Sequence, residues 1–570
     1  MRSSPLKSLD AARDYEHANY NNLNICILGA SYAGLATCQR IYRELLPQLK
    51  TYNKHFSYRI TLVAPSTHLY WNISAPRDIV SQTQIKHDQT FIPIHDGLKG
   101  FRDDDFEYIQ GAVTDLDTNN CSITVDCPLR QTKLPANDDP FMTPSLPSQQ
   151  RVVKYHALVV ATGSTAHSSL LSLRGSHNNT MEAIDNFQAR LVTAESVIIA
   201  GGGPSGIEIA GQIAHYYNNK SKVKRKKTPQ QDGIAEHKHD EALPTSSPSR
   251  ASSPSKLLAR LSPGKSLHPQ PCLYSKDILL LASSSELLPH LNSKVGPRAR
   301  HQLESLGVRV ITDTFVETAT SSSFTNKTVV KLNNGTSLTC DIYIPATGVT
   351  PNTQWLPTDS PMLEQGFVAT IADDNGYSTM RVYVPPEGLA GDTIFVEEPG
   401  TNSVASVDDL TGSPRRLLNK ANTTPQTPQS ADFLRTPLPR IYAIGDCASY
   451  SQQCILDAYA PIPTLLANLA IDLKAYQLAI SNPYGGNKAE IFRLYMQSVS
   501  YRREVKDNQL VPIGGMRPAG VGVLKGVGLP GLAVWALKGR EYTVDRIDEV
   551  VRMGVSPYPG QSGQIGSVRK

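Results

Sequence analysis

The sequence predicts an α/β protein built on two βαβ domains, with a small α+β domain at its C-terminal end. Three observations lead to this prediction. A Gly-rich turn joins an apolar run to a helical pattern at residues 24–46, and the same arrangement recurs at residues 196–217. Each arrangement is followed further along by an apolar run that ends in Ala-Thr-Gly, at 161–163 and at 346–348. The length of 570 residues exceeds what one hydrophobic core normally organises.

The first βαβ unit begins after a polar tail at residues 1–22. NICIL (24–28) predicts a buried strand, a Gly-containing turn follows, and the next helix is expected to end at Pro47. RITLV (59–63) predicts the second strand. The stretches 106–117 and 122–126 resemble strands of an antiparallel meander, and 155–163 returns to a buried strand.

The second βαβ unit begins at residue 196. SVIIA predicts its strand and IEIAGQIAHYY its helix, but the next strand, DILLLA (277–282), comes only after a Ser/Pro/Lys-rich interruption. That interruption, residues 219–275, has too few apolar residues to form a core, and we expect a disordered insertion. A helix at 294–306 and a hairpin around Asn-Gly at 334–335 complete the unit.

We therefore expect a discontinuous first domain at 23–190 and 438–475, and a second domain at 191–355. Residues 356–437 are predicted to form a partly disordered connection. The strand RIYAI (440–444) and a helix after Pro463 belong to the first domain, and residues 476–570 to the small α+β domain.

The composition excludes several classes of function. A net charge of +5 is small for this length and indicates no nucleic-acid partner. The eight cysteines form no Cys-x-x-Cys pair, so we expect no metal site and no disulfide framework, and reduced thiols in the cytoplasm. The N-terminal segment has no apolar core typical of a signal peptide.

The first glycine turn, Gly29-Ala30-Ser31-Tyr32-Ala33-Gly34, has the spacing of a dinucleotide-binding turn. Gly29 permits the tight turn, Gly34 lets helix and strand pack closely, and the helix N-terminus would face a pyrophosphate. Ser31 replaces the usual middle Gly. The acidic residue that normally binds the ribose after the second strand is missing, because Ala64 and Pro65 follow that strand, and Ser66 or a backbone group would have to replace it.

The second glycine turn, Gly201-Gly202-Gly203-Pro204-Ser205-Gly206, is complete. Together the two turns predict two Rossmann-like dinucleotide-binding domains of the three-layer ββα type. Glu208 follows closely and is a candidate for a role near the nicotinamide, although it is equally compatible with a solvated helix turn. Ser283–Ser285 follow the next strand and do not distinguish NAD from NADP.

Gly445-Asp446 ends the strand RIYAI, where a carboxylate can accept hydrogen bonds from the ribityl hydroxyls of a flavin. An Asp at such a position also forms turns and helix caps. Its order along the chain, after two glycine turns and two Ala-Thr-Gly triplets, favours the flavin interpretation.

In this order of motifs the chain resembles the pyridine nucleotide–disulfide oxidoreductase superfamily. The segments TLVAPSTHLYWNISAPR, YHALVVATGSTA and VPIGGMRPAGVGVLKGVGLPGLAVWALKGREY resemble its apoptosis-inducing-factor-like group, which includes the ferroptosis-suppressor type. The resemblance implies two cofactors, FAD and NAD(P)H. The residues implied to bind FAD are Gly29, Ala30, Ser31, Tyr32, Ala33, Gly34, Arg77, Val113 through its backbone, Thr162, Gly163 and Asp446. Those implied to bind NAD(P)H are Gly201, Gly203, Gly206 and Glu208.

The activity implied is hydride transfer from NAD(P)H to the flavin, with the electrons passed to a small-molecule acceptor such as a quinone. No catalytic side chain is predicted, and the first helix has only Cys38 where disulfide reductases have a cysteine pair. Two alternatives remain open: a flavin-binding signalling protein with slow turnover, favoured by the basic run at 220–227, and a type II NADH dehydrogenase with peripheral membrane contact. The sequence does not indicate the oligomeric state.

Overall fold

The computed structural model describes residues 21–128, 148–225, 275–322, 324–384, 440–481, 487–503, 508–515, 518–558 and 566–569. Most of the predicted N-terminal tail at 1–22, most of the predicted insertion at 219–275 and most of the connection at 356–437 lie outside these residues.

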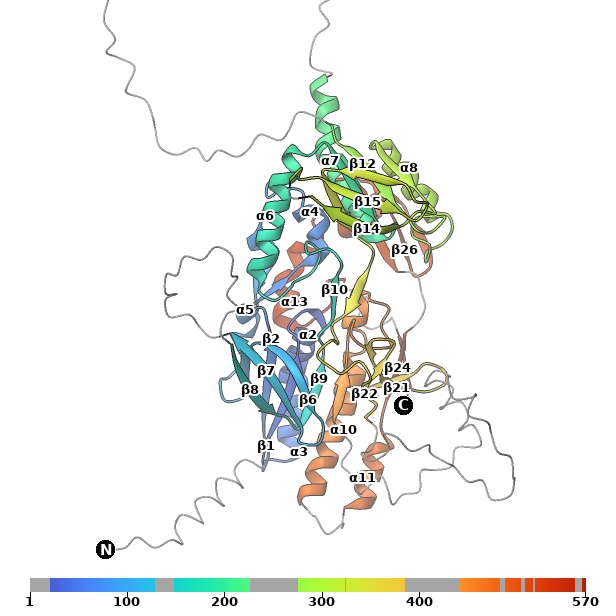
Figure 1. Ribbon diagram of the computed structural model, residues 1–570. Helices are drawn as coiled ribbons and strands as arrows, with labels where there is room; N and C mark the ends of the chain where they lie inside the picture. Colours follow the sequence, from blue (N-terminus) through green and yellow to red (C-terminus); the bar gives the residue numbers. More distant parts are fainter. Residues whose placement is uncertain are drawn as a thin grey trace, which may run out of the picture.

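The first sheet is parallel at its centre. Strand β1 (Asn22–Leu28) lies between β2 (Ser57–Ala64) and β9 (Ala157–Val160), and β5 (Phe106–Gln110) and β23 (Ile441–Ala443) continue the sheet on either side. The first sheet is thus completed by β23, which comes from much later in the chain, as expected for a discontinuous first domain (Figure 1).

Alternation along β1 produces three layers. Ile25 and Ile27 pack with the helices α2 (Tyr32–Arg40), α3 (Leu46–Tyr52) and α10 (Ile462–Ser481) in one core. Cys26 and Leu28 point to the opposite face and pack against the antiparallel sheet of β6 (Ala112–Asp117), β7 (Ser122–Pro128) and β8 (Ser148–Lys154). A continuous apolar run is required here because both faces of the strand are buried.

The second sheet repeats this plan (Figure 1). Its strand order is β13 (Val308–Ile311), β12 (Asp277–Leu281), β11 (Ser196–Ala200) and β17 (Ile342–Pro345), all parallel. One face packs on α6 (His177–Thr193), α7 (Pro204–Arg225) and α8 (Val295–Ser305). The other packs on β14 (Val316–Ser321), β15 (Thr328–Leu332) and β16 (Ser337–Cys340). The predicted α/β architecture with two Rossmann-like sheets is confirmed.

The last part of the chain is divided between the two halves, and this differs from the separate C-terminal domain that we expected. β24 (Ser500–Arg503) and β28 (Gly566–Arg569) join the first sheet through β22 (Ser378–Val382), and α13 (Ile547–Met553) packs in its core. By contrast, β25 (Gln509–Pro512) and β26 (Gly520–Leu524) contribute buried side chains to the core of the second half. The reason is that the apolar faces of these short elements are buried only against the two larger halves.

Two local expectations need correction. The first helix does not end at Pro47: a π-helical turn, η1 (Ile41–Leu45), leads directly into α3, and Pro47 stands in the first turn of α3. Strand β5 is not part of the meander, since it pairs in parallel with β2. Gly111 separates β5 from β6. A glycine is needed at this position, since a Cβ would lie 2.6 Å from a Val125 methyl carbon.

The remaining elements are short. They are β3 (His68–Tyr70), η2 (Asn72–Ser74), α4 (Ala75–Asp78), η3 (His87–Gln89), β4 (Phe91–Pro93), α5 (Ile94–Leu98), β10 (Ser164–Ala166), β18 (Val349–Pro351), β19 (Leu363–Glu364), β20 (Phe367–Val368), β21 (Thr370–Ala372), η5 (Ile455–Ala458), α11 (Lys488–Tyr495), β27 (Val527–Leu529), α12 (Gly531–Val534), η6 (Trp535–Gly539) and η7 (Val544–Arg546). Within the described part of the chain, no helix has the length and apolar character that crossing a membrane requires.

Candidate functional site

The first glycine turn is held against the first Ala-Thr-Gly triplet. The Gly29 N–H donates to the Val63 carbonyl at 2.7 Å, and Gly29 has a φ of +102°. A Cβ on Gly29 would lie 2.2 Å from the Ala161 carbonyl oxygen, and one on Gly34 would lie 1.9 Å from the Gly29 oxygen. Neither position has room for any side chain, so both glycines are required for strand, turn and helix to pack this closely.

The second glycine turn has the same geometry with the second triplet. The Gly201 N–H donates to the Leu281 carbonyl at 2.8 Å, and its φ is +128°. A Cβ on Gly201 would lie 2.1 Å from the Ala346 oxygen, and one on Gly206 would lie 2.0 Å from the Gly201 oxygen. The two halves are therefore built around matching turns, as a duplicated architecture predicts.

The outer sides of these turns are open. A Cβ on Gly203 or on Gly163 would meet no atom within 4 Å. Ser31 is exposed at the N-cap of α2, its side chain caps no backbone N–H, and Ala30 and Ala33 are buried behind it. The N-terminal amides of α2 and α7 therefore start beside turns where a pyrophosphate could approach the backbone.

Tyr32 and Val113 stand at opposite sides of the first half. The Tyr32 hydroxyl donates to the Asn72 side-chain oxygen at 2.8 Å, and its ring meets Trp71 edge to face. Val113 is a half-buried residue of β6 paired with Val125. The hydroxyl of Ser66, the candidate replacement for the ribose acid, donates instead to the His68 carbonyl at 2.9 Å.

Asp446 follows β23 and lies next to the first triplet. Its Oδ2 accepts a hydrogen bond from the Ser164 hydroxyl at 2.8 Å, and Ser164 directly follows Thr162-Gly163. Burial raises the pKa of Asp446, while the Ser164 hydrogen bond opposes that change. The structure thus brings together Gly29, the Thr162-Gly163 turn and Asp446, which come from three distant parts of the sequence.

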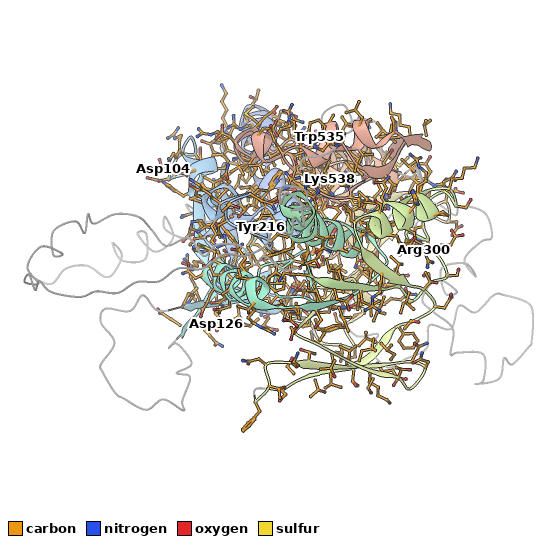
Figure 2. The ribbon with its side chains drawn as sticks, turned by 90° about the horizontal axis from the view of Figure 1, so that it is seen from above. Asp104, Asp126, Tyr216, Arg300, Trp535 and Lys538 are labelled. Atoms are coloured by element: carbon orange, nitrogen blue, oxygen red, sulfur yellow. The ribbon has the colours of Figure 1, made fainter. Side chains whose placement is uncertain are left out.

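Glu208 is buried and forms an ion pair that the sequence did not predict. Its Oε1 lies 2.7 Å from Nζ of Lys538, a residue of the π-helical turn η6. Burial raises the pKa of Glu208, and the Lys538 charge lowers it. In Figure 2, Lys538 and Trp535 are labelled on this C-terminal turn, next to the second half. Lys538 lies in a C-terminal segment whose only signal in the sequence is its family resemblance. Such a resemblance does not reveal an ion pair with a residue 330 positions away.

Arg77 belongs to the same cluster. Its guanidinium donates to the carbonyls of Gly539 at 2.5 Å and Arg540 at 2.8 Å, and it lies over the Tyr542 ring at 4.7 Å from the centroid. Burial lowers the pKa of Arg77, and Tyr542 and Glu208 oppose this. The side chain thus fastens α4 to the C-terminal segment, while its predicted contact with FAD stays a prediction.

Cys447 and Cys454, which both follow Asp446 in the chain, are free thiols. Cys447 is fully buried and its thiol faces the carbonyls of Val160 and Ile444 at 3.5 Å. Burial raises the pKa of both thiols, which disfavours the thiolate that dithiol chemistry needs.

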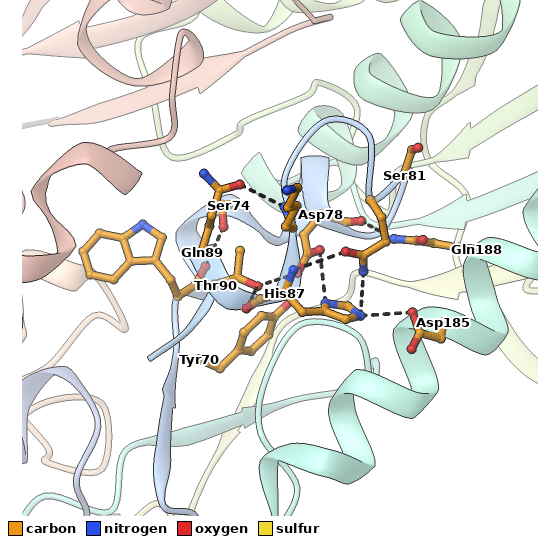
Figure 3. A network of polar contacts seen from close by, with 12 residues as sticks. Tyr70, Ser74, Asp78, Ser81, His87, Gln89, Thr90, Asp185 and Gln188 are labelled. Atoms are coloured by element: carbon orange, nitrogen blue, oxygen red, sulfur yellow. Dashed lines mark hydrogen bonds and ion pairs between the residues drawn. The ribbon is translucent and has the colours of Figure 1, made fainter. Parts of the chain in front are cut away.

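A second polar network lies around His87 (Figure 3). The Nε2 of His87 lies 3.0 Å from Asp185 of α6, and its Nδ1 lies 3.7 Å from the buried Asp78, which also accepts from Thr90 at 3.1 Å. Gln188 donates to the Asp78 carbonyl at 2.6 Å. The network fastens the segment after β3 to α6. The described residues include no group of three or more His, Cys, Asp or Glu arranged to hold a metal ion.

Comparisons with known proteins agree with this geometry. Over 530 residues the chain is 26% identical to the oxidoreductase phnG of Penicillium herquei, covering 91% of this chain and 93% of that protein. It is 25% identical over 197 residues to apoptosis-inducing factor 1 of Saccharomyces cerevisiae, covering 35% of this chain and 42% of that one. The fold matches NDH2 from Plasmodium falciparum in complex with NADH, with a TM-score of 0.51 and 12% identity over 93% of this chain and 97% of that chain.

The family model for pyridine nucleotide-disulphide oxidoreductases matches residues 23–384. This range contains both glycine turns and both Ala-Thr-Gly triplets, the features around which the two halves are built. The chain therefore belongs to the pyridine nucleotide-disulphide oxidoreductase family.

Proposed function

We propose that this protein is an FAD-dependent oxidoreductase that takes hydride from NAD(P)H and passes the electrons to a quinone or a similar small acceptor. The observation that supports it most directly is the duplicated turn geometry, in which a Cβ on Gly29 would lie 2.2 Å from the Ala161 oxygen and one on Gly201 would lie 2.1 Å from the Ala346 oxygen. Two such turns in one chain provide two dinucleotide sites.

Assignment of FAD to the first site follows from Asp446. Asp446 is a half-buried carboxylate next to the Ala-Thr-Gly triplet of the first half, and the hydroxyl of Ser164 orients it. The second site, whose turn is complete, would then bind NAD(P)H. Bound FAD supplies the chemistry of accepting a hydride and releasing electrons.

The protein residues contribute binding and electrostatics. The amides of α2 and α7 would face the two pyrophosphates, and Asp446 would accept hydrogen bonds from hydroxyl groups. The Lys538–Glu208 pair holds opposite charges in a buried position at the start of α7. The overall reaction balances when NAD(P)H gives one hydride, the solvent gives one proton, and a quinone becomes a hydroquinone.

A cytoplasmic location and placement among the apoptosis-inducing-factor-like proteins are further parts of this proposal. The second is supported by the match to the yeast factor, which covers about a third of the chain. NDH2 shares the fold, and turnover with a membrane quinone is therefore the alternative. Reoxidation of the reduced flavin by lipid quinones would reveal it.

The experiment is flavin reduction followed under anaerobic conditions. The purified protein is expected to carry the absorption of bound flavin, which bleaches when NADH or NADPH is mixed with it in a stopped-flow instrument. Reoxidation by a panel of soluble quinones, lipid quinones and O₂ then identifies the acceptor. Bound flavin that neither nucleotide bleaches would contradict an enzymatic function and would favour a flavin-binding signalling protein.

A further inference from the structure

A two-stranded ribbon connects the two halves of the molecule. Strand β10 follows the first Ala-Thr-Gly triplet and β18 follows the second, and the two strands pair antiparallel with Ser164 opposite Pro351 and Ala166 opposite Val349. Figure 1 shows β10 between the two larger sheets. Each strand thus runs from its own turn toward the turn of the other half.

Asn352, the residue after β18, makes three hydrogen bonds with the first triplet and a fourth with β10. Its backbone N–H donates to the Gly163 carbonyl at 2.9 Å, and its side-chain amide donates to the Thr162 carbonyl at 2.9 Å. Its backbone carbonyl accepts from the Thr162 hydroxyl at 2.7 Å, and its side-chain oxygen accepts from the Thr165 hydroxyl at 2.7 Å. Both polar atoms of this side chain therefore bind residues of the first triplet and of the strand that follows it.

His167, the residue after β10, makes the corresponding contacts with the second triplet. Its N–H donates to the Gly348 carbonyl at 3.3 Å, and its Nδ1 lies 2.7 Å from the Thr347 hydroxyl. Its Nε2 lies 3.4 Å from the hydroxyl of Thr350. His167 therefore contacts the same positions of the second half that Asn352 contacts in the first half. These positions are Thr347, Gly348 and Thr350, which correspond to Thr162, Gly163 and Thr165.

The two ends of this arrangement differ in burial. Asn352 and the first triplet are partly or fully buried, and Ser164 extends the contact to Asp446 at 2.8 Å. His167, Thr347 and Gly348 are exposed to solvent. The better-protected end belongs to the proposed flavin site, which retains its cofactor, and the exposed end to the site from which a nucleotide must leave in every cycle.

We propose that Asn352 and His167 are paired positioning residues that fix the two Ala-Thr-Gly turns relative to each other and so set the geometry of hydride transfer. The inference rests on the proposed function for its two cofactors. Each residue reaches across the ribbon to the turn of the opposite half. Loss of either side chain therefore loosens that turn without removing any group that binds the nucleotide there. Hydride transfer is sensitive to such displacements, since an error of ~1 Å costs up to about a hundredfold in rate.

The test compares Asn352→Ala and His167→Ala with two control variants at exposed positions, Asn119→Ala and His290→Ala. Both ribbon variants are expected to lower the limiting rate of flavin reduction at saturating nucleotide by about tenfold to a hundredfold. Asn352→Ala should also release flavin faster, whereas His167→Ala should retain it. The control variants should behave as the wild type in both measurements.

A conservative variant separates positioning from a general loss of stability. The side-chain amide of His167→Asn can occupy the place of Nδ1 beside Thr347, so this variant should recover most of the rate that His167→Ala loses. Wild-type reduction rates in both alanine variants, or a loss at His167→Ala that Asn does not recover, would overturn the proposal.

A readout without cofactor distinguishes this proposal from the proposed function. Amide hydrogen exchange over residues 161–166 should accelerate in Asn352→Ala, and exchange over 346–351 should accelerate in His167→Ala. If the wild type binds no flavin, the proposed function fails, and this exchange pattern still decides whether the two residues hold the turns. Unchanged exchange in both variants would exclude the positioning role.

Discussion

At the scale of single residues, the glycines of the two turns differ in what they do. Gly201 has no room for a Cβ and has a φ of +128°, whereas Gly203 has free space around it and no positive φ. Gly201 is therefore required for packing, whereas Gly203 leaves space through which a ligand can approach the backbone. The sequence motif contains both but does not separate these roles.

Substitution separates them. Gly201→Ala should destabilise the protein by about 3 kcal/mol or more, because a methyl group 2.1 Å from the Ala346 oxygen must displace backbone in an already strained conformation. Gly203→Ala should leave the thermal midpoint unchanged and weaken NAD(P)H binding by about tenfold, because it obstructs only the outer side of the turn. Calorimetry and nucleotide titration measure the two effects. Equal loss of stability in both variants would contradict this division of roles.

His156 makes stability depend on pH. Its Nδ1 accepts the Asn24 N–H at 3.0 Å, and burial, with the nearby Arg440 charge, lowers its pKa from 6.5 to about 4. The unfolded chain therefore binds a proton at a higher pH than the folded chain does. The stabilising contribution is complete above pH 6.5 and is lost as the pH falls toward 4, to a limit of about 3 kcal/mol.

The prediction is that wild-type protein loses more stability than His156→Gln between pH 7.5 and pH 5. The glutamine keeps an acceptor for Asn24 but cannot take up a proton. Urea unfolding at the two pH values gives the difference. Parallel losses in the two proteins would show that His156 does not titrate in this way.

At the scale of elements, the C-terminal turn η6 is joined to helix α7 by a buried ion pair. Lys538 and Glu208 are both largely buried, and Arg77 from α4 binds the carbonyls of Gly539 and Arg540. Three elements from separate regions of the chain therefore meet at one cluster of charges. Amphipathic patterns predict each element, but they carry no information about which helix a charged side chain will reach.

Removing one charge of this pair should be costly. Lys538→Met leaves the Glu208 carboxylate buried without its partner and is expected to destabilise the fold by about 3–5 kcal/mol, and to raise the pKa of Glu208 further. The double variant Lys538→Met with Glu208→Gln should recover much of this loss. Lys331→Met, which breaks the exposed pair with Glu317, serves as the matched control and should change stability little. No recovery in the double variant would show that the effect is not electrostatic.

At the scale of the whole molecule, two similar halves are connected so that segments far apart in sequence complete each other. The first sheet requires β23, and the C-terminal part of the chain supplies buried side chains to both halves. Asn218 and Lys276, which border the long interruption of the second half, are hydrogen-bonded to each other. The Lys276 N–H donates to the Asn218 side-chain oxygen at 2.8 Å, and the Asn218 side-chain amide donates to the Lys276 carbonyl at 3.2 Å.

This closure predicts that residues 219–275 can be replaced by a short Gly/Ser linker. The shortened protein should keep its thermal midpoint and its rate of flavin reduction, because Asn218 and Lys276, which border this range, are already held together by two hydrogen bonds. A circular dichroism melt and stopped-flow reduction provide the measurements. A folded, flavin-bound product that NAD(P)H no longer reduces would assign the segment a part in turnover.

The sequence by itself determined the two halves, because each glycine turn, apolar strand and Ala-Thr-Gly triplet follows from local requirements of backbone space and burial on both faces of a strand. It also determined the family. Only the tertiary structure decided which residues meet: Ser164 with Asp446, Glu208 with Lys538, Asn352 with the Thr162 turn. Such contacts depend on how distant segments are brought together, and hydrophobic periodicity specifies only which face of each element is buried.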